Sequence, residues 1–215
     1  MNINRNFTSK VNTTYSKNRK IEYIVIHYTA GTKVCEGKAK ASVQNFAQAT
    51  RKASADFVVD EGSVAYQYNP DISNYYCWSV GGSKYPSCST TGLGKFHGKC
   101  KNSNSISIEM CSSKLDGGKS YSAEDTDFYV TDKVWNNTIE LTAQLMKQYN
   151  IDINHVIRHA DVNGKLCPAF MCSTRVQDVY KIPGESVWNK FKLDLEEALE
   201  PKKATTSSST NKTIP

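Results

Sequence analysis

The segment of this chain that is richest in reactive side chains is RHADVNGKLCP, residues 158–168, which holds His159, Lys165 and Cys167. Neutral imidazole and thiolate are typical zinc ligands, and a loop of this length can fold back and bring the two together. A surface histidine and a buried free cysteine would give the same local pattern. The segment by itself therefore leaves both interpretations open.

Two further candidate residues lie on predicted strands. The run IEYIVIHYTA begins at Ile21 and is typical of a buried strand, whose C-terminal end would present His27. The segment SISIEM alternates, so Glu109 is predicted on the same face as Ser107 and opposite Ile108. A carboxylate beside a metal site can move protons, whereas a glutamate on an exposed strand face is usually only solvated.

Apolar patterns elsewhere predict the elements that would position these side chains. Two strands, ADFVVD and SVAYQY, flank a turn at Glu61–Gly62 and predict a hairpin, and INHVIRH predicts a strand that leads into the loop of His159. Helical periodicity predicts three helices, over about 38–52, from about Thr131 as the N-cap, and over about 185–199.

Composition divides the chain of 215 residues into three parts, with enough length for one globular domain. Residues 1–20 carry a charge of +5 and are predicted to form a basic arm, and 201–215 carry +3 and have the composition of a flexible linker. The overall charge of +6 thus leaves −2 on the predicted domain, residues 21–200. Because the basic residues lie in the ends, the sequence argues against a nucleic-acid-binding groove.

The sequence also bears on where the protein acts. It has neither the ~20 consecutive apolar residues of a membrane span nor the apolar core of a secretory signal. We therefore expect synthesis in the cytoplasm without membrane insertion, and cysteines kept as thiols there, at least one of the seven being unpaired. The terminal linker predicts a tether or a further domain beyond residue 215.

The order of the motifs is more specific than any one of them. The segments EYIVIHYTA, SADFVVDEGSVAYQ, WSVGG, NSISIEM and RHADVNGKLCP follow one another over residues 21–170. In this order they resemble the zinc-dependent N-acetylmuramoyl-L-alanine amidases of the type-2 amidase family. That family includes phage endolysins, bacterial autolysins and peptidoglycan-recognition proteins. The resemblance is greatest to amidases of Firmicutes and their phages.

The resemblance implies an α/β fold: a mixed central β-sheet flanked by helices, in a single domain with the zinc site at the strand ends. It implies an enzyme that cleaves the amide between N-acetylmuramic acid and L-alanine in peptidoglycan and so lyses the cell wall. Such an enzyme would reach the wall after release from the cytoplasm, as in phage lysis, or by non-classical export. If the chain continues beyond residue 215, a cell-wall-binding domain is the expected continuation. A peptidoglycan-recognition domain that binds without cutting is the alternative.

Five residues take their roles from the resemblance. His27, His159 and Cys167 match the zinc ligands and leave one coordination position open for water or substrate. Glu109 matches the residue that many members use as general base and acid, and Lys165 matches the basic residue that stabilises the oxyanion. Since non-catalytic relatives typically lack the zinc cysteine, Cys167 favours the enzyme over the binding domain.

The chain departs from the family pattern at three positions. Asp56 stands where many relatives have a histidine, and Ala55 stands where some have a catalytic tyrosine. A tyrosine-based proton relay is therefore not expected, and Glu109 would carry the proton transfer. Ser79 replaces a histidine that relatives often place after the tryptophan of WSVGG, which removes a substrate contact but no zinc ligand.

Four residues have weaker assignments. Trp78 is a candidate to stack on substrate, with a packed loop anchor as the alternative, and Asn104 is a candidate hydrogen-bond donor to the muropeptide. His155 lies four residues before His159, too far along a strand to share a metal. Cys172 would complete a purely structural zinc site if it supplied a fourth ligand.

Overall fold

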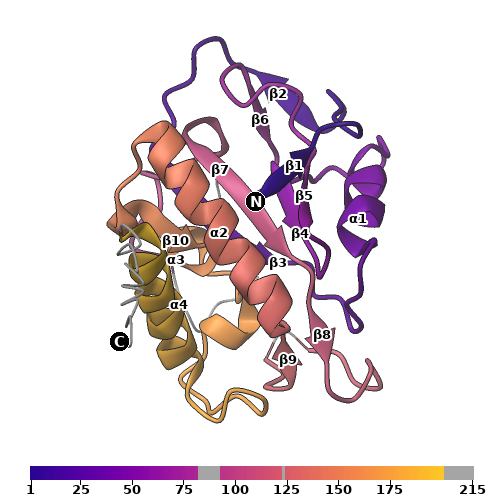
Figure 1. Ribbon diagram of the computed structural model, residues 1–215, viewed down its shortest axis with the longest axis vertical. Coiled ribbons are helices and arrows are strands. Elements are labelled where there is room, and N and C mark those ends of the chain that lie inside the picture. Colours follow the sequence, from indigo (N-terminus) through magenta and orange to yellow (C-terminus); the bar gives the residue numbers. More distant parts are fainter. Residues whose placement is uncertain (82–92, 123, 201–215) are drawn as a thin grey trace, which may run out of the picture.

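The computed structural model describes residues 1–81, 93–122 and 124–200. Its centre is a six-stranded sheet in the order β1-β5-β4-β7-β3-β10 (Figure 1). The β4–β5 hairpin is antiparallel and the other four pairs are parallel, so the predicted mixed sheet is confirmed. The strands are β1 (Asn2–Asn4), β3 (Tyr23–Tyr28), β4 (Phe57–Val59), β5 (Val64–Gln67), β7 (Ser105–Met110) and β10 (Val156–Arg158).

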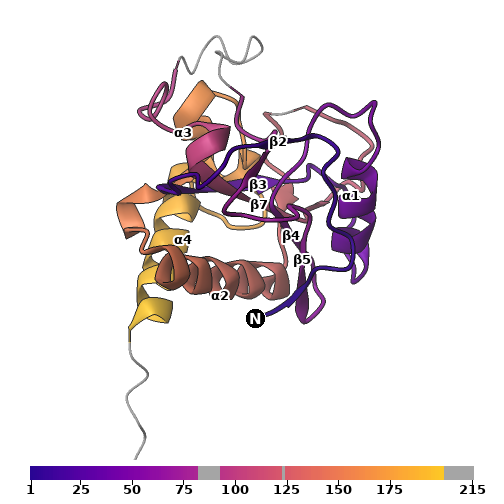
Figure 2. The ribbon, with the colours of Figure 1, turned by 90° about the horizontal axis from the view of Figure 1, so that it is seen from above.

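One face of the sheet is covered by the two long helices, α2 (Asp132–Tyr149) and α4 (Gly184–Leu199), as Figures 1 and 2 show. The alternating side chains of β3 and β7 that point to this side, such as Ile26 and Ile108, are fully buried in the main core. The Thr131 side chain accepts a hydrogen bond from the Val134 amide and caps α2, as predicted. Burial of this face explains why it carries no polar side chains from β3 or β7.

The opposite face of the sheet has two smaller cores with polar side chains between them. Helix α1 (Lys38–Phe46) packs against β4, while Val25 of β3 packs in a cluster with Val80, Cys100, Ile157 and Val162. Helix α1 ends six residues earlier than predicted, because the Asn12 amide donates to the carbonyls of Phe46 and Gln48 at 2.8 and 2.9 Å. Those carbonyls are thereby satisfied without a further helical turn.

The first twenty residues differ from the prediction of a separate basic arm. Strand β1 adds in parallel to β5 at the edge of the central sheet, and β2 (Thr13–Tyr15) pairs with β6 (Tyr75–Cys77). Backbone pairing and packing fix this segment. Neither could be predicted from its sequence, which is polar and shows no alternation of apolar residues. Strand β6 lies within residues 69–104, a stretch rich in Gly, Ser, Asn and Tyr that does not show the alternation typical of a strand, and residues 82–92 of this stretch lie outside the described residues.

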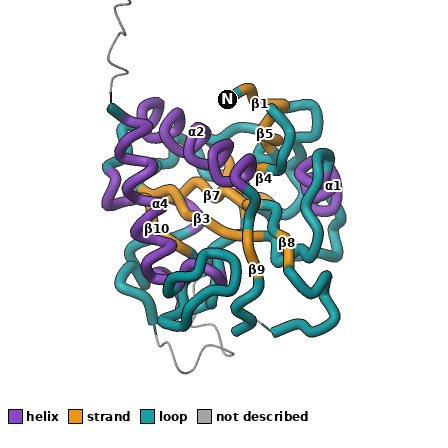
Figure 3. Tube along the Cα trace, turned by 60° about the horizontal axis from the view of Figure 1, so that its bottom comes forward, coloured by secondary structure: helices purple, strands orange, loops and turns teal. Residues whose placement is uncertain are grey.

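The second half of the domain connects the sheet to the helices through short elements. Strands β8 (Ser113–Lys114) and β9 (Phe128–Tyr129) pair beyond the end of β7, as Figure 3 shows. The predicted strand INHVIRH begins as a 3-10 turn and is extended only in β10, after which α3 (Ala160–Asn163) follows at once. None of the helices in the described part of the chain could span a membrane. The predicted linker, 201–215, lies outside the described residues.

Asp56, which stands where relatives have a histidine, is buried at the start of β4. One carboxylate oxygen accepts hydrogen bonds from the backbone amide and the hydroxyl of Ser107, both at 2.8 Å. The other accepts from the Asn69 side chain at 2.6 Å. Since Ser107 precedes Glu109 by two residues on the same face of β7, this network fixes the strand directly below Glu109.

We expect Asp56→Ala to lower the free energy of unfolding by about 2–4 kcal/mol, because it leaves the buried donors of Ser107 and Asn69 without an acceptor. Urea denaturation measures the change. Glu197→Ala, on the exposed side of α4, is the control and should shift stability by no more than about 0.5 kcal/mol. Equal stability of the two variants would contradict the structural role of Asp56.

Candidate metal centre

The three predicted metal ligands come together in one buried group. The nitrogen and sulfur atoms of His27, His159 and Cys167 that could bind a metal lie within 4.8 Å of one another. Nδ1 of His27 is 3.8 Å from Sγ of Cys167, and the two imidazole rings are 4.6 Å apart between centroids. Two imidazoles and one thiolate are a donor set that suits zinc, with a fourth position left for a non-protein ligand.

Strand pairing places the histidines. His27 is the fifth residue of β3, and His159 directly follows β10, the parallel neighbour of β3. The His159 amide donates to the Ile26 carbonyl at 3.2 Å, so the ladder continues up to the ligand itself. The Ala160 amide donates to the Cys167 carbonyl at 3.1 Å. This bond closes the loop and brings Cys167 next to His159.

Arg158 holds this loop from the other side, a role that the sequence did not reveal. Its buried guanidinium forms a two-point ion pair with Asp161 and a further ion pair with Glu185 of α4 at 2.9 Å. It also donates to the Met171 carbonyl, beyond Cys167. The planar fork thus connects both ends of the loop that carries His159 and Cys167.

Contacts at Nε2 orient the ring of His159. Nε2 lies 3.1 Å from the Val80 carbonyl and 3.0 Å from the side-chain nitrogen of Asn163, while Asn102 accepts from the Val80 amide at 2.8 Å and fixes that residue. Nδ1 of His159 is buried with no hydrogen-bond partner among the described residues. An oriented imidazole with one nitrogen unused is what a metal site requires. A carbonyl has no side-chain signature, so sequence reasoning missed Val80.

Electrostatics keep both imidazoles neutral. Burial lowers the pKa of His27 well below its ordinary value, and the nearby His159 and Lys165 act in the same direction. Burial, reinforced by the charge of Lys165, lowers the pKa of His159 to about 4. Both rings therefore offer lone pairs at neutral pH, as ligands must.

Glu109 lies beside the metal group. It is the direct register partner of His27 across the β3–β7 pair, and the two side chains point to the same face of the sheet. Burial raises the pKa of Glu109 to about 7, against the opposing charges of Lys165 and Arg51. One carboxylate oxygen, Oε2, is buried without a partner in the described part of the chain. A carboxyl group of this kind can both accept and release a proton near neutral pH.

Of the two predicted substrate contacts, Asn104 is not brought to this group, whereas Trp78 lies two residues before Val80, whose carbonyl contacts His159. The Trp78 indole donates to the Thr14 hydroxyl at 2.8 Å and so connects β6 to the N-terminal segment, which fits the alternative of a loop anchor. Asn104 lies at the opposite end of β7 from Glu109, about 16 Å away by strand rise. Its amide donates to Glu22 and to the Lys99 carbonyl, which stabilises the turn before the strand.

Of the other two candidates, His155 lies apart from the metal group and Cys172 lies just outside it. The His155 ring packs against Tyr23 at 4.8 Å, near the start of β3. Cys172 is within electrostatic reach of Cys167, but the group that could hold a metal among the described residues consists of His27, His159 and Cys167.

Comparison with known protein families shows which family this chain belongs to. The family model described as N-acetylmuramoyl-L-alanine amidase matches residues 17–170, which include the three candidate metal ligands as well as Glu109 and Lys165. The chain belongs to this amidase family.

Individual amidases agree with this assignment. The chain is 31% identical over 196 residues to the amidase CwlA of Bacillus subtilis, covering 90% of the chain and 61% of CwlA. It is 30% identical over 192 residues to the amidase XlyB of the same organism, covering 87% of the chain and 47% of XlyB. The chain thus spans about half to three-fifths of the length of these relatives.

Solved structures of endolysin domains share the fold. PlyL matches with a TM-score of 0.59 and 24% identity, over 91% of this chain and 96% of PlyL. The catalytic domain of PlyG matches with a TM-score of 0.59 and 23% identity, over 96% of this chain and all of that domain. The chain therefore has the same fold as these two domains.

We expect the His159 imidazole of the metal-free protein to titrate near pH 4 rather than near 6.5. The unfolded chain takes up a proton on this ring near pH 6.5, whereas the folded protein does so only near pH 4. The stability that the neutral ring provides is therefore fully present above about pH 6.5 and is lost as the pH falls toward 4. NMR titration of labelled histidine measures the midpoint. A midpoint above 6 would mean that the ring is solvated and the buried group is not formed.

Proposed function

We propose that this protein is a zinc-dependent N-acetylmuramoyl-L-alanine amidase that cleaves the bond between N-acetylmuramic acid and L-alanine in peptidoglycan. The observation that carries the proposal is the buried group of His27, His159 and Cys167, in family-matched positions, with Glu109 as the register partner of His27. Three protein ligands rather than four are the arrangement of a catalytic zinc site. A structural site would be closed by a fourth.

The proposed centre would hold zinc through Nδ1 of His159, one ring nitrogen of His27 and Sγ of Cys167. The unused, buried Nδ1 of His159 and the short approach of His27 to Cys167 support this assignment. A zinc ion bound here would supply Lewis acidity and lower the pKa of a bound water to about 7.

Glu109 and Lys165 carry the remaining roles. The carboxylate of Glu109 takes a proton from the attacking water and returns it to the leaving amine of L-alanine, and its raised pKa of about 7 fits both steps. The ammonium of Lys165, whose charge acts on His27, His159 and Glu109 alike, binds the oxyanion that forms at the scissile carbonyl.

We expect one zinc per chain in the purified protein and loss of most of it in Cys167→Ser, because a hydroxyl is a poor replacement for a thiolate ligand. Elemental analysis after dialysis measures the content. Cys172→Ser, just outside the group, is the matched control and should retain the metal. Equal zinc in wild type and Cys167→Ser would exclude Cys167 as a ligand.

We expect Glu109→Gln to reduce turnover of muropeptide by about 10²–10⁴-fold, because the amide cannot accept a proton, while zinc content and affinity for the muropeptide stay near those of wild type. Product analysis by mass spectrometry should show new L-alanine amino termini on intact glycan strands with wild type. New reducing sugar ends would instead indicate a glycosidase. Binding of muropeptide by wild type without any cleavage would indicate a recognition domain.

A further inference from the structure

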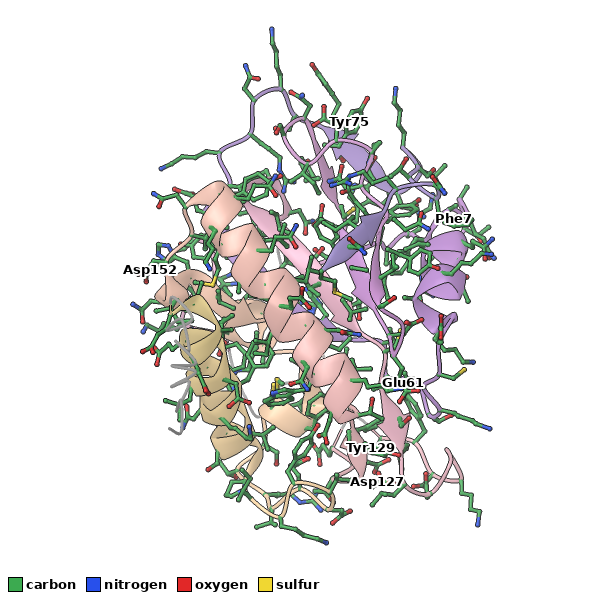
Figure 4. All side chains as sticks on the ribbon, viewed as in Figure 1. Phe7, Glu61, Tyr75, Asp127, Tyr129 and Asp152 are labelled. Carbon is green, nitrogen blue, oxygen red and sulfur yellow. The ribbon has the colours of Figure 1, made fainter. Side chains whose placement is uncertain are left out.

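An acidic loop projects from the sheet immediately beyond the strand of Glu109. This acidic loop comprises residues 115–127, described apart from residue 123, and connects β8 to β9. In Figure 4, Asp127 and Tyr129 mark its base, at the end of the molecule opposite Tyr75. The amidase chemistry proposed above assigns no role to this loop.

A buried lysine organises the acidic loop. The ammonium of Lys114, almost inaccessible to solvent, forms ion pairs with Asp116 at 3.1 Å, Asp125 at 3.1 Å and Asp127 at 2.7 Å. Asp116 in turn accepts hydrogen bonds from the amide and hydroxyl of Ser120. These contacts fix the backbone on the N-terminal side of Tyr121.

The acidic loop is fastened to the strand that carries His27. A side chain at Gly118, which has φ of +88°, would come within 2.8 Å of Thr32, so the loop lies directly on the segment that follows β3. The Tyr121 hydroxyl donates to the Ala30 carbonyl at 3.2 Å. The acidic loop is therefore bound to the chain at Ala30, three residues after His27.

Tyr121 is held in place yet exposed. Its ring meets Phe128 edge to face at 5.7 Å, and Phe128 meets Tyr28, the residue after His27, at 5.4 Å. Nevertheless 63% of Tyr121 is accessible, more than for almost any other large apolar side chain described. Burial raises the pKa of Tyr121, and the positive charge of Lys165 acts in the opposite direction. The phenol therefore lies within electrostatic reach of the Lys165 ammonium.

An exposed aromatic ring with a fixed hydroxyl is suited to binding, since little conformational freedom is lost when a ligand packs on it. The two parts of the substrate differ in charge: the stem peptide carries carboxylates, whereas the N-acetylated sugar rings are neutral. Residues 114–127 carry a net charge of −2, which disfavours the peptide at this side. Arg51, which lies over the Phe46 ring of α1 and whose charge acts on Glu109, favours the peptide on that side instead.

We propose that Tyr121, positioned by the acidic loop, binds a sugar ring of the glycan strand beside the scissile amide. This inference rests on the proposed amidase function and adds to it a subsite for the glycan. The Tyr121 ring would contact the sugar face, and its contribution would appear in substrate binding rather than in the chemical step.

Two series of synthetic substrates test the proposal. One keeps the stem peptide constant and lengthens the glycan from a single muramic acid to a tetrasaccharide, and the other keeps the disaccharide constant and lengthens the peptide. We expect Tyr121→Ala to raise KM about three- to tenfold on the tetrasaccharide, with kcat little changed and a smaller effect on the single sugar. Tyr121→Phe, which keeps the ring, should stay close to wild type.

Tyr15→Ala is the matched control, because Tyr15 is 60% accessible and packs edge to face on Tyr75 at the far end of the molecule. It should behave as wild type on every substrate. A Tyr121→Ala effect that is absent, or that follows the length of the peptide instead of the glycan, would overturn the inference. If wild type cleaves none of the substrates, the amidase function itself fails and the inference fails with it.

Discussion

The parallel pairing of β3 with both β7 and β10 fixes the positions of His27, Glu109 and His159. Parallel neighbours end at the same edge of a sheet, so the residues at their carboxyl ends meet there. In this chain His27 and Glu109 are register partners, and the His159 amide continues the β3–β10 ladder. A shift of one residue in β3 would turn His27 toward α2 and bring an apolar side chain into the site.

Burial then determines how these groups behave. His27 and His159 are kept neutral and Glu109 is kept partly protonated by the same low-polarity surroundings, because burial disfavours any charged form. The nearby ammonium of Lys165 works with burial at the histidines and against it at Glu109. The same burial thus leaves both histidines neutral, as metal ligands must be, and leaves Glu109 able to exchange a proton near neutral pH.

Much of the sheet and the metal group could be predicted from the sequence, since both leave periodic or chemically distinctive residues. Alternation in SISIEM placed Glu109 on the correct face, and the spacing of His159 and Cys167 indicated a returning loop. The zinc assignment itself came from resemblance.

Other features leave no such pattern. Strand β1 is held by backbone pairing, so its polar residues looked like an arm. The orientation of His159 depends on the Val80 carbonyl, and the loop closure depends on Arg158, both of which are contacts between distant segments. Trp78 and Asn104 have the chemistry for substrate binding, but their polar groups are engaged within the protein. Residue type alone could not distinguish the two uses.

The central claim is that this edge of the sheet builds an open, three-ligand metal centre. X-ray absorption spectroscopy at the zinc edge of the metal-loaded protein tests it most directly. The account predicts two nitrogen ligands at about 2.0–2.1 Å, one sulfur ligand at about 2.3 Å and one light, non-protein ligand. Two sulfur ligands, or zinc surrounded by oxygen only, would contradict it.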